Sequence, residues 1–249
     1  ALTLAPVPRL DTGLDASLSA QRRAVSRSAR APSDAPAPAV DGNALLSFVD
    51  GITPQQRDDV LFSVQLALRG ASGAFDRFAQ TEAWYKKYTE ILERLGWTSE
   101  QFAFARHDQQ EGELRMDQAA LALIAAIATQ NQLAVLNEAI QALETLAEDD
   151  KTLRLFDFHT STQASGNFQL GAVQTASNGA LSLALGAFYF KSHDARRRVL
   201  FVKWGAQQLE FWTAAQRLTL NTTQYATLRD AVERKLGLEA QDFIADLPL

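Results

Sequence analysis

The chain has 249 residues with ordinary apolar and charged fractions, enough for one large domain or two small ones. The absence of cysteine excludes thiol catalysis, thiolate metal sites and S-acylation. The net charge of −5 does not favour nucleic acid or an anionic membrane on bulk electrostatics, and we expect no nucleic-acid partner.

No stretch reaches the roughly 18 apolar residues of a membrane-spanning helix. No basic segment followed by an apolar one marks a secretion signal. Both a cytoplasmic location and export by a route without a visible signal peptide fit the sequence. Removal of a leader before Ala1 fits it as well.

Residues 1–43 differ from the rest of the chain because they are rich in Ala, Pro and Ser. They hold five of the seven prolines and no aromatic residue, so they cannot bury enough apolar area to offset their ordering entropy. We interpret them as a flexible arm. Leu10, Leu14 and Leu18 recur every four residues, as in an amphipathic helix that docks on a partner. A passive linker and a leader are the alternatives.

Residues 44–249 are predicted to form a single domain that begins with helices. Thr53, Pro54 and Gln56 form a capping box at the start of a helix that ends near Gly70. Three further helices are predicted, at 81–95 with Gly96 suited to its left-handed C-terminal cap, at 118–129, and after Asn131. The last two form an antiparallel hairpin or one long helix kinked at the junction. The wholly apolar run 119–128 fits a buried central helix, or a helical hairpin that a toxin inserts into a membrane.

The second half is predicted to form strands. Aromatic and alternating segments mark strands at 151–160, 167–175, 180–190, 197–204 and 208–220, after an isolated short strand at 101–107. Asn178-Gly179 predicts a type I′ hairpin turn. The parity of large apolar residues changes at Gly186, which predicts a β-bulge.

These elements predict an α+β fold. About four N-terminal helices pack on a C-terminal antiparallel meander of about five strands, because sequential strands with short turns pair as neighbours. A last helix, capped by Asn221 and ending at Gly237, closes the domain.

No catalytic or cofactor signature is present. The chain lacks a nucleophile elbow, a phosphate-binding loop and any metal-binding histidine motif, so we expect no cofactor and no metal. Asp157 and His159, two residues apart on a predicted strand, would share one face and bring a carboxylate beside an imidazole. Surface histidines without a catalytic role are the alternative.

A basic and aromatic cluster surrounds one predicted hairpin turn. Its basic members are Lys191, Arg196, Arg197, Arg198 and Lys203, with the aromatic residues Tyr189, Phe190, Phe201 and Trp204 nearby. Such a cluster fits a phospholipid headgroup, a glycan or an acidic partner. The alternative is a solvated turn whose charges prevent pairing between sheet edges. Trp212 is a further candidate, because aromatic residues on both faces of its predicted strand indicate a binding surface or a strand covered on both sides.

Several short segments resemble a bacterial family, the Erwinia virulence factor family. They are Trp84-Tyr85, Gly96-Trp97, 126–130, 155–157, 165–169 and 186–190. The resemblance covers about residues 45–249 and implies an α/β virulence-associated protein without a recognised active site. The family is associated with fatty acylation of a buried cysteine, which cannot apply to this cysteine-free chain.

Three functions follow as hypotheses. The first is a non-enzymatic, toxin-like effector that binds a membrane or a protein partner. The second is a self-assembling structural or cargo protein, a homo-oligomer whose arm docks on a neighbouring subunit or a container. The third is an enzyme that uses Asp157 and His159.

Overall fold

The computed structural model describes most of the chain between residues 38 and 245. The described ranges are 38–99, 103–107, 113–147, 150–162, 165–192, 198, 200–205 and 209–245, with the backbone alone for 238–245. Leu10, Leu14 and Leu18 of the predicted arm lie outside these ranges. The proposed arm therefore stays a prediction for residues 1–37, whereas residues 39–41 pair with residues 44–46 as a strand of the folded domain.

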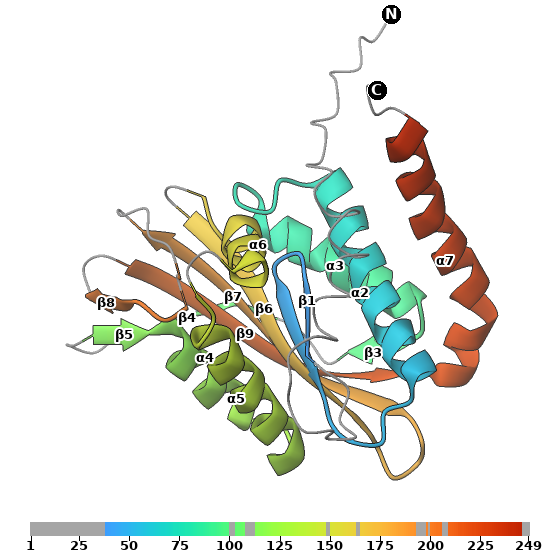
Figure 1. Cartoon of the computed structure of the whole chain (residues 1–249), viewed down its shortest axis with the longest axis horizontal. Coiled ribbons are helices and arrows are strands. Elements are labelled where there is room, and N and C mark those ends of the chain that lie inside the picture. Colours follow the sequence, from blue (N-terminus) through green and yellow to red (C-terminus); the bar gives the residue numbers. More distant parts are fainter. Residues whose placement is uncertain are drawn as a thin grey trace, which may run out of the picture.

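A seven-stranded mixed sheet runs through the middle of the molecule (Figure 1). In spatial order its strands are β1 (Ala39–Asp41), β2 (Ala44–Phe48), β6 (Ser165–Thr175), β7 (Leu181–Ser192), β9 (Leu209–Leu220) and β3 (Trp97–Ser99), with β4 (Ala105–Arg106) also on β9. β2 and β6 are parallel, whereas the other pairs are antiparallel. A separate ladder joins β5 (Glu113–Arg115) to β8 (Lys203–Gly205).

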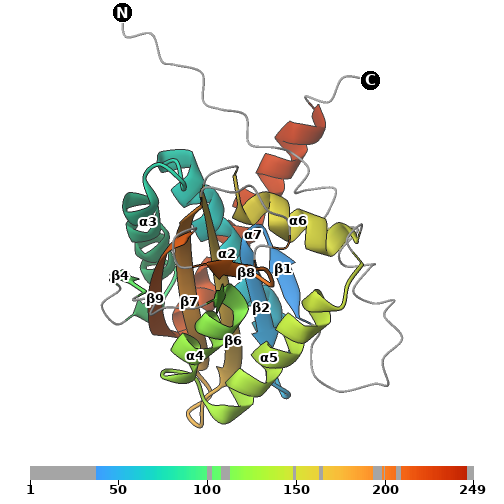
Figure 2. The ribbon, with the colours of Figure 1, turned by 90° about the vertical axis from the view of Figure 1, so that its left-hand side faces the viewer.

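Helices cover both faces of this sheet (Figures 1 and 2). One face carries α2 (Pro54–Ala74), α3 (Thr81–Arg94) and α7 (Thr222–Ala245). The other face carries α4 (Met116–Ala125), α5 (Gln130–Glu144) and α6 (Lys151–Thr160). The fold is therefore a three-layer α/β/α sandwich with a hydrophobic core on each side of the sheet.

The predicted division into a helical first half and a sheet-forming second half is wrong. β1 and β2 precede α2, and α6 occupies the segment 151–160 that was predicted as a strand. A helix forms there because Asp150 caps the amides of Thr152 and Leu153, and because Leu153 and Phe156 lie on one buried face. The sheet is mixed rather than a meander, since β2 lies parallel to β6.

The predicted bulge at Gly186 is also wrong. β7 pairs with β9 without interruption along its whole length. Leu181 and Leu185 face α2 and α3, whereas Phe188 and Phe190 face the α4 side. The parity changes because both faces of the strand are buried, so each half places its large side chains on a different face.

Several local signals are confirmed. At the start of α2, the Thr53 hydroxyl accepts from the Gln56 amide at 3.2 Å, and the Gln56 side chain accepts from the Thr53 amide at 3.0 Å. Gly96 follows α3 with a φ of 97°. The hairpin turn between β6 and β7 lies where predicted, but only Gly179, with a φ of 82°, adopts a positive φ, so the turn is not type I′.

Candidate functional site

The helical cover on the α2–α3 face stops short of one end of β7 and β9. Ala187 and Ala214 are buried on this face, whereas the next residues outward, Tyr189 and Trp212, are only half-buried. Tyr189 and Trp212 are cross-strand partners with ring centroids 5.1 Å apart. The end of the sheet therefore presents an accessible pair of amphipathic aromatic rings.

Two cations accompany this aromatic pair. The Lys191 ammonium lies 5.6 Å from the Trp212 ring centroid, and the Arg106 guanidinium lies 6.0 Å from it, within cation–π range. Strand pairing brings them together, because β4 places Arg106 opposite Trp212 and β7 places Lys191 two residues after Tyr189. We call Arg106, Tyr189, Lys191 and Trp212 the aromatic–cation surface.

One carboxylate partly balances these charges. Glu210 lies opposite Lys191 in the ladder and makes an ion pair with Arg106 at 3.5 Å. The side chains of Arg106 and Glu210 are 67% and 49% exposed, and such a pair contributes at most about 1 kcal/mol. Two cations and one carboxylate therefore leave this described part of the sheet end locally positive, although the whole chain carries −5.

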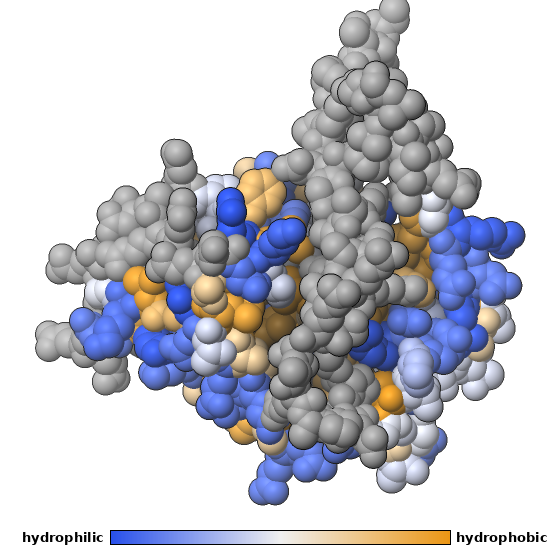
Figure 3. Space-filling view, in the orientation of Figure 1, coloured by the Kyte–Doolittle hydropathy of each residue, from blue (hydrophilic) through white to orange (hydrophobic). Residues whose placement is uncertain are grey.

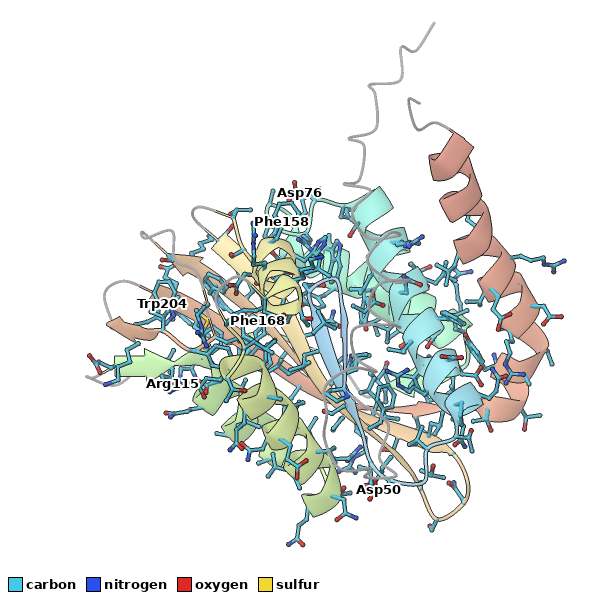
Figure 4. The ribbon with its side chains drawn as sticks, in the orientation of Figure 1. Asp50, Asp76, Arg115, Phe158, Phe168 and Trp204 are labelled. Carbon is cyan, nitrogen blue, oxygen red and sulfur yellow. The ribbon has the colours of Figure 1, made fainter. Side chains whose placement is uncertain are left out.

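A single large apolar side chain is exposed at the same end of the sheet, on the other face. Phe158, in the last turn of α6, is 61% exposed, and no other described large hydrophobic residue is classed as exposed (Figure 4). α6 leads into the start of β6 through a bridge between Ser161 and Gly166. Gly166 is paired with Phe190, next to Lys191, so Phe158 extends from the same end as the aromatic–cation surface.

The predicted basic cluster is only partly brought together. Lys191 and Trp212 belong to the aromatic–cation surface, whereas Trp204 is completely buried and Lys203 pairs with Glu113 at 2.8 Å. Arg196 and Arg197 lie outside the described residues. Figure 4 shows Trp204 on the α4 side of the molecule, near the β5–β8 ladder.

Arg198 connects the loop after β7 to the helical layer. Its amide donates to the Asp157 carboxylate at 2.9 Å, and its guanidinium donates to the carbonyl of Glu144 at the end of α5. The guanidinium also lies 5.6 Å from the Phe201 ring. Arg198 therefore makes structural contacts within the fold.

The predicted Asp157–His159 pair does not share a strand face, because both residues lie in α6. Side chains two residues apart in a helix point about 200° away from each other. The Asp157 carboxylate accepts a hydrogen bond from the Arg198 amide, and His159 is buried. In the part of the chain that the structure describes, no three His, Asp or Glu side chains are grouped to hold a metal.

Sequence reasoning missed one member of the surface, Arg106, which is far from Trp212 in sequence and becomes its neighbour only through strand pairing. Tyr189 is among the aromatic residues near the predicted basic cluster, and the pairing of β7 with β9 places it beside Trp212. The predicted strand around 101–107 was the available signal, but nothing in it indicated that β9 would be its partner.

An open pocket of about 380 Å³ lies at the opposite end of β6, where the strand ends at Thr175. It is lined by Val49, Asp50, Gly51, Thr53, Gln56, Asn131, Gln174 and Thr175. Asp50 is the only charged side chain in this lining (Figure 4). The pocket therefore offers no acid–base pair and no second carboxylate for a metal.

No family model and no curated protein matches the chain. Three solved structures are similar to it at low identity. A delta-endotoxin is 12% identical with a TM-score of 0.44, over 77% of this chain and 88% of that one. The activated Cyt2Ba monomer from Bacillus thuringiensis subsp. israelensis is 11% identical with a TM-score of 0.45, over 73% of this chain and 98% of that one.

The third structure is the Evf virulence factor. It is 12% identical with a TM-score of 0.30, over 89% of this chain and 88% of that one. The resemblance to the Erwinia virulence factor family, first seen in short sequence segments, is thus met again among the solved structures.

Proposed function

We propose that this protein is a non-enzymatic, toxin-like effector that binds anionic membrane surfaces through the aromatic–cation surface. The observation that supports the proposal most is the half-buried Trp212 ring with Lys191 and Arg106 beside it. Trp and Tyr favour the headgroup level of a bilayer, where one part of the ring is apolar and another is wet. Lys and Arg near the surface add about 1 kcal/mol each with anionic lipids.

Phe158 adds an apolar contact at the same end of the sheet. An exposed phenylalanine gains free energy when its area leaves water, at about 25 cal/mol per Å². A protein that lies on the membrane through this end would place Phe158 and Trp212 in the interface from opposite faces of the sheet. In the described part of the chain no helix has both the length and the apolar character to cross a membrane.

The surface of the α4–α5 side offers a contrast. Where Figure 3 shows the described residues of this face, hydrophilic side chains interrupt the apolar areas. Within α4, Ala120 and Ile124 are fully buried against the sheet. One face of the run 119–128 therefore packs in a core, whereas Ala122, Ala125 and Ala126 are exposed, and the proposal does not depend on this run.

Vesicle flotation tests membrane binding. We expect the protein to float with vesicles that contain phosphatidylglycerol, to stay unbound with pure phosphatidylcholine, and to be released by high salt. The double substitution Arg106→Gln and Lys191→Gln should weaken binding by about tenfold or more. Lys86→Gln with Lys235→Gln removes the same charge from exposed positions on α3 and α7 and should change binding little.

Tryptophan fluorescence then locates the contact. Trp84, Trp97 and Trp204 are completely buried, so Trp212 is the residue whose emission should respond to lipid. Brominated anionic lipids should quench part of the emission, and Trp212→Phe should remove that part. Dye release from the same vesicles tests the toxin-like component. Absence of flotation with every anionic composition would refute the proposal.

A further inference from the structure

The turn between β1 and β2 is buried, although hairpin turns usually lie in solvent. Asp41 and Asn43 are 5% and 1% exposed. A Cβ at Gly42 would lie 3.8 Å from the Leu68 side chain of α2. The Asn43 amide donates to the Asn167 side chain of β6 at 2.6 Å. The turn is therefore seated between the sheet and the α2–α3 layer.

The seated turn carries a carboxylate. Burial raises the pKa of Asp41 to about 7, although the charge of Arg69 on α2 acts in the opposite direction. On α3, burial raises the pKa of Tyr88, and Asp41 adds to that rise. The Tyr88 hydroxyl is buried without a hydrogen-bond partner. A negative charge on Asp41 is thus favoured by the charge of Arg69 but opposed more strongly by burial, beside a Tyr88 hydroxyl that has no hydrogen-bond partner.

Other titratable groups complete these surroundings. Tyr85 on α3 is fully buried, and burial lowers the pKa of Arg77, just before α3, to about 10. The Arg77 carbonyl accepts a hydrogen bond from Asn167 at 2.7 Å, which ties it to the same network. α6 packs on β1 from the opposite face and contributes one buried imidazole, His159.

We propose that Asp41 makes the seating of the β1–β2 turn depend on protonation. The protonated carboxyl stays buried between α2 and α3, whereas the ionised carboxylate favours an opened turn in which water solvates it. The direction of the pH dependence follows from the linkage between proton binding and closure of the turn. A carboxyl whose pKa rises from 3.8 to about 7 on folding stabilises the closed turn fully below about pH 4, and this stabilisation is lost as the pH rises through 7.

Hydrogen exchange on the full chain tests this inference. Exchange rates of the amides in residues 39–48, corrected for intrinsic chemistry, should rise between pH 5 and pH 8 in the wild type. Between pH 5 and pH 8 the pKa change limits this rise to about a hundredfold, and we expect at least about tenfold. Asp41→Asn should make protection independent of pH in this range. His159→Gln should keep the pH dependence, because it removes the buried imidazole of the helix that packs on β1 from the opposite face but leaves Asp41.

Equal pH dependence in the wild type and in Asp41→Asn would overturn the inference, as would a flat profile in the wild type. If Asp41→Asn does not fold, the ¹³C carboxyl shift of Asp41 in the wild type decides instead. A midpoint near 7 supports the inference, and a midpoint near the ordinary value of 3.8 overturns it. Neither measurement involves the aromatic–cation surface, so failure of membrane binding leaves this test intact.

Discussion

The Arg229 guanidinium of α7 donates two hydrogen bonds to the Asp59 carboxylate of α2, each at 2.7 Å, across 170 residues of sequence. The Asp59 side chain is 3% exposed, whereas that of Arg229 is 27% exposed. Gln55 adds a third hydrogen bond to Asp59 at 3.0 Å. The terminal helix is therefore joined to α2 by a bidentate ion pair at the edge of the core.

Arg229→Gln should destabilise the protein by about 3 kcal/mol, because removing one partner leaves the buried Asp59 carboxylate without its charge-assisted bonds. Urea unfolding followed by circular dichroism measures the loss. Arg234→Gln is the matched control, since Arg234 is exposed and its side chain bonds only to the carbonyl of Asp230 among the contacts described. A loss equal to that of the control would show that the Asp59–Arg229 pair is not stabilising.

Gly186→Ala should destabilise the protein by about 1 to 3 kcal/mol. A Cβ at this position would lie 2.7 Å from the Phe188 ring and 2.8 Å from the Ile124 side chain of α4, so these groups would have to move. Ile124→Val in the same protein should restore part of the stability by making room.

Gly73→Ala should change stability in the opposite direction to Gly186→Ala. This glycine lies in α2, and a Cβ there meets nothing within 4 Å. Alanine should therefore stabilise the helix by about 0.5 to 1 kcal/mol. Thermal unfolding of both alanine variants gives the comparison, and a destabilising Gly73→Ala together with a neutral Gly186→Ala would contradict the packing described for these sites.

The sequence predicted local features well, such as the helix cap at Thr53 and the position of the turn at Gly179. The capping box of Thr53 and Gln56 requires only residues three apart, and the turn at Gly179 requires only a positive φ. The layer order was not predictable in the same way. β2 pairs with β6 across more than 110 residues, and the sequence pattern of neither strand predicts the other as its partner. Segment 151–160 was assigned as a strand because its aromatic content outweighed the helical spacing of Leu153 and Phe156.

The candidate site shows the same limit. The sequence indicates Lys191 through the basic and aromatic residues that cluster around it, and Trp212 through the aromatic residues on both faces of its strand. Trp204 belongs to the same cluster as Lys191 but is buried, since β8 turns its ring into the core beside Phe190. Composition identified the right region, but burial and strand register decided which residues face solvent.

Arg198 and Lys203 should differ sharply when each is replaced by alanine. Arg198→Ala loses the bond to the Glu144 carbonyl and the contact with Phe201, so we expect a loss of about 1 to 2 kcal/mol. Lys203→Ala removes an exposed ion pair with Glu113 and should cost at most about 1 kcal/mol.

Arg198→Gly separates the two causes at this site. Arg198 has a φ of 56°, a backbone conformation that suits glycine better than alanine. Glycine should therefore be more stable than alanine here, while both lack the guanidinium contacts. Denaturant midpoints for the three variants measure these differences, and an Arg198→Ala variant as stable as Lys203→Ala would show that the guanidinium contacts contribute little.

Tyr88→Phe should leave stability unchanged or raise it by about 1 kcal/mol. The Tyr88 ring is fully packed, stacking on Trp84 with centroids 5.6 Å apart, but its hydroxyl is buried without a hydrogen-bond partner. Phenylalanine keeps the ring contacts and removes the group that must leave water without compensation. Tyr85→Phe is the control, because the Tyr85 hydroxyl donates to the Phe168 carbonyl at 3.5 Å and its removal should not stabilise. Calorimetric melting of both variants at one pH decides the matter, and a clear loss of stability in Tyr88→Phe would mean that its hydroxyl is bonded in solution.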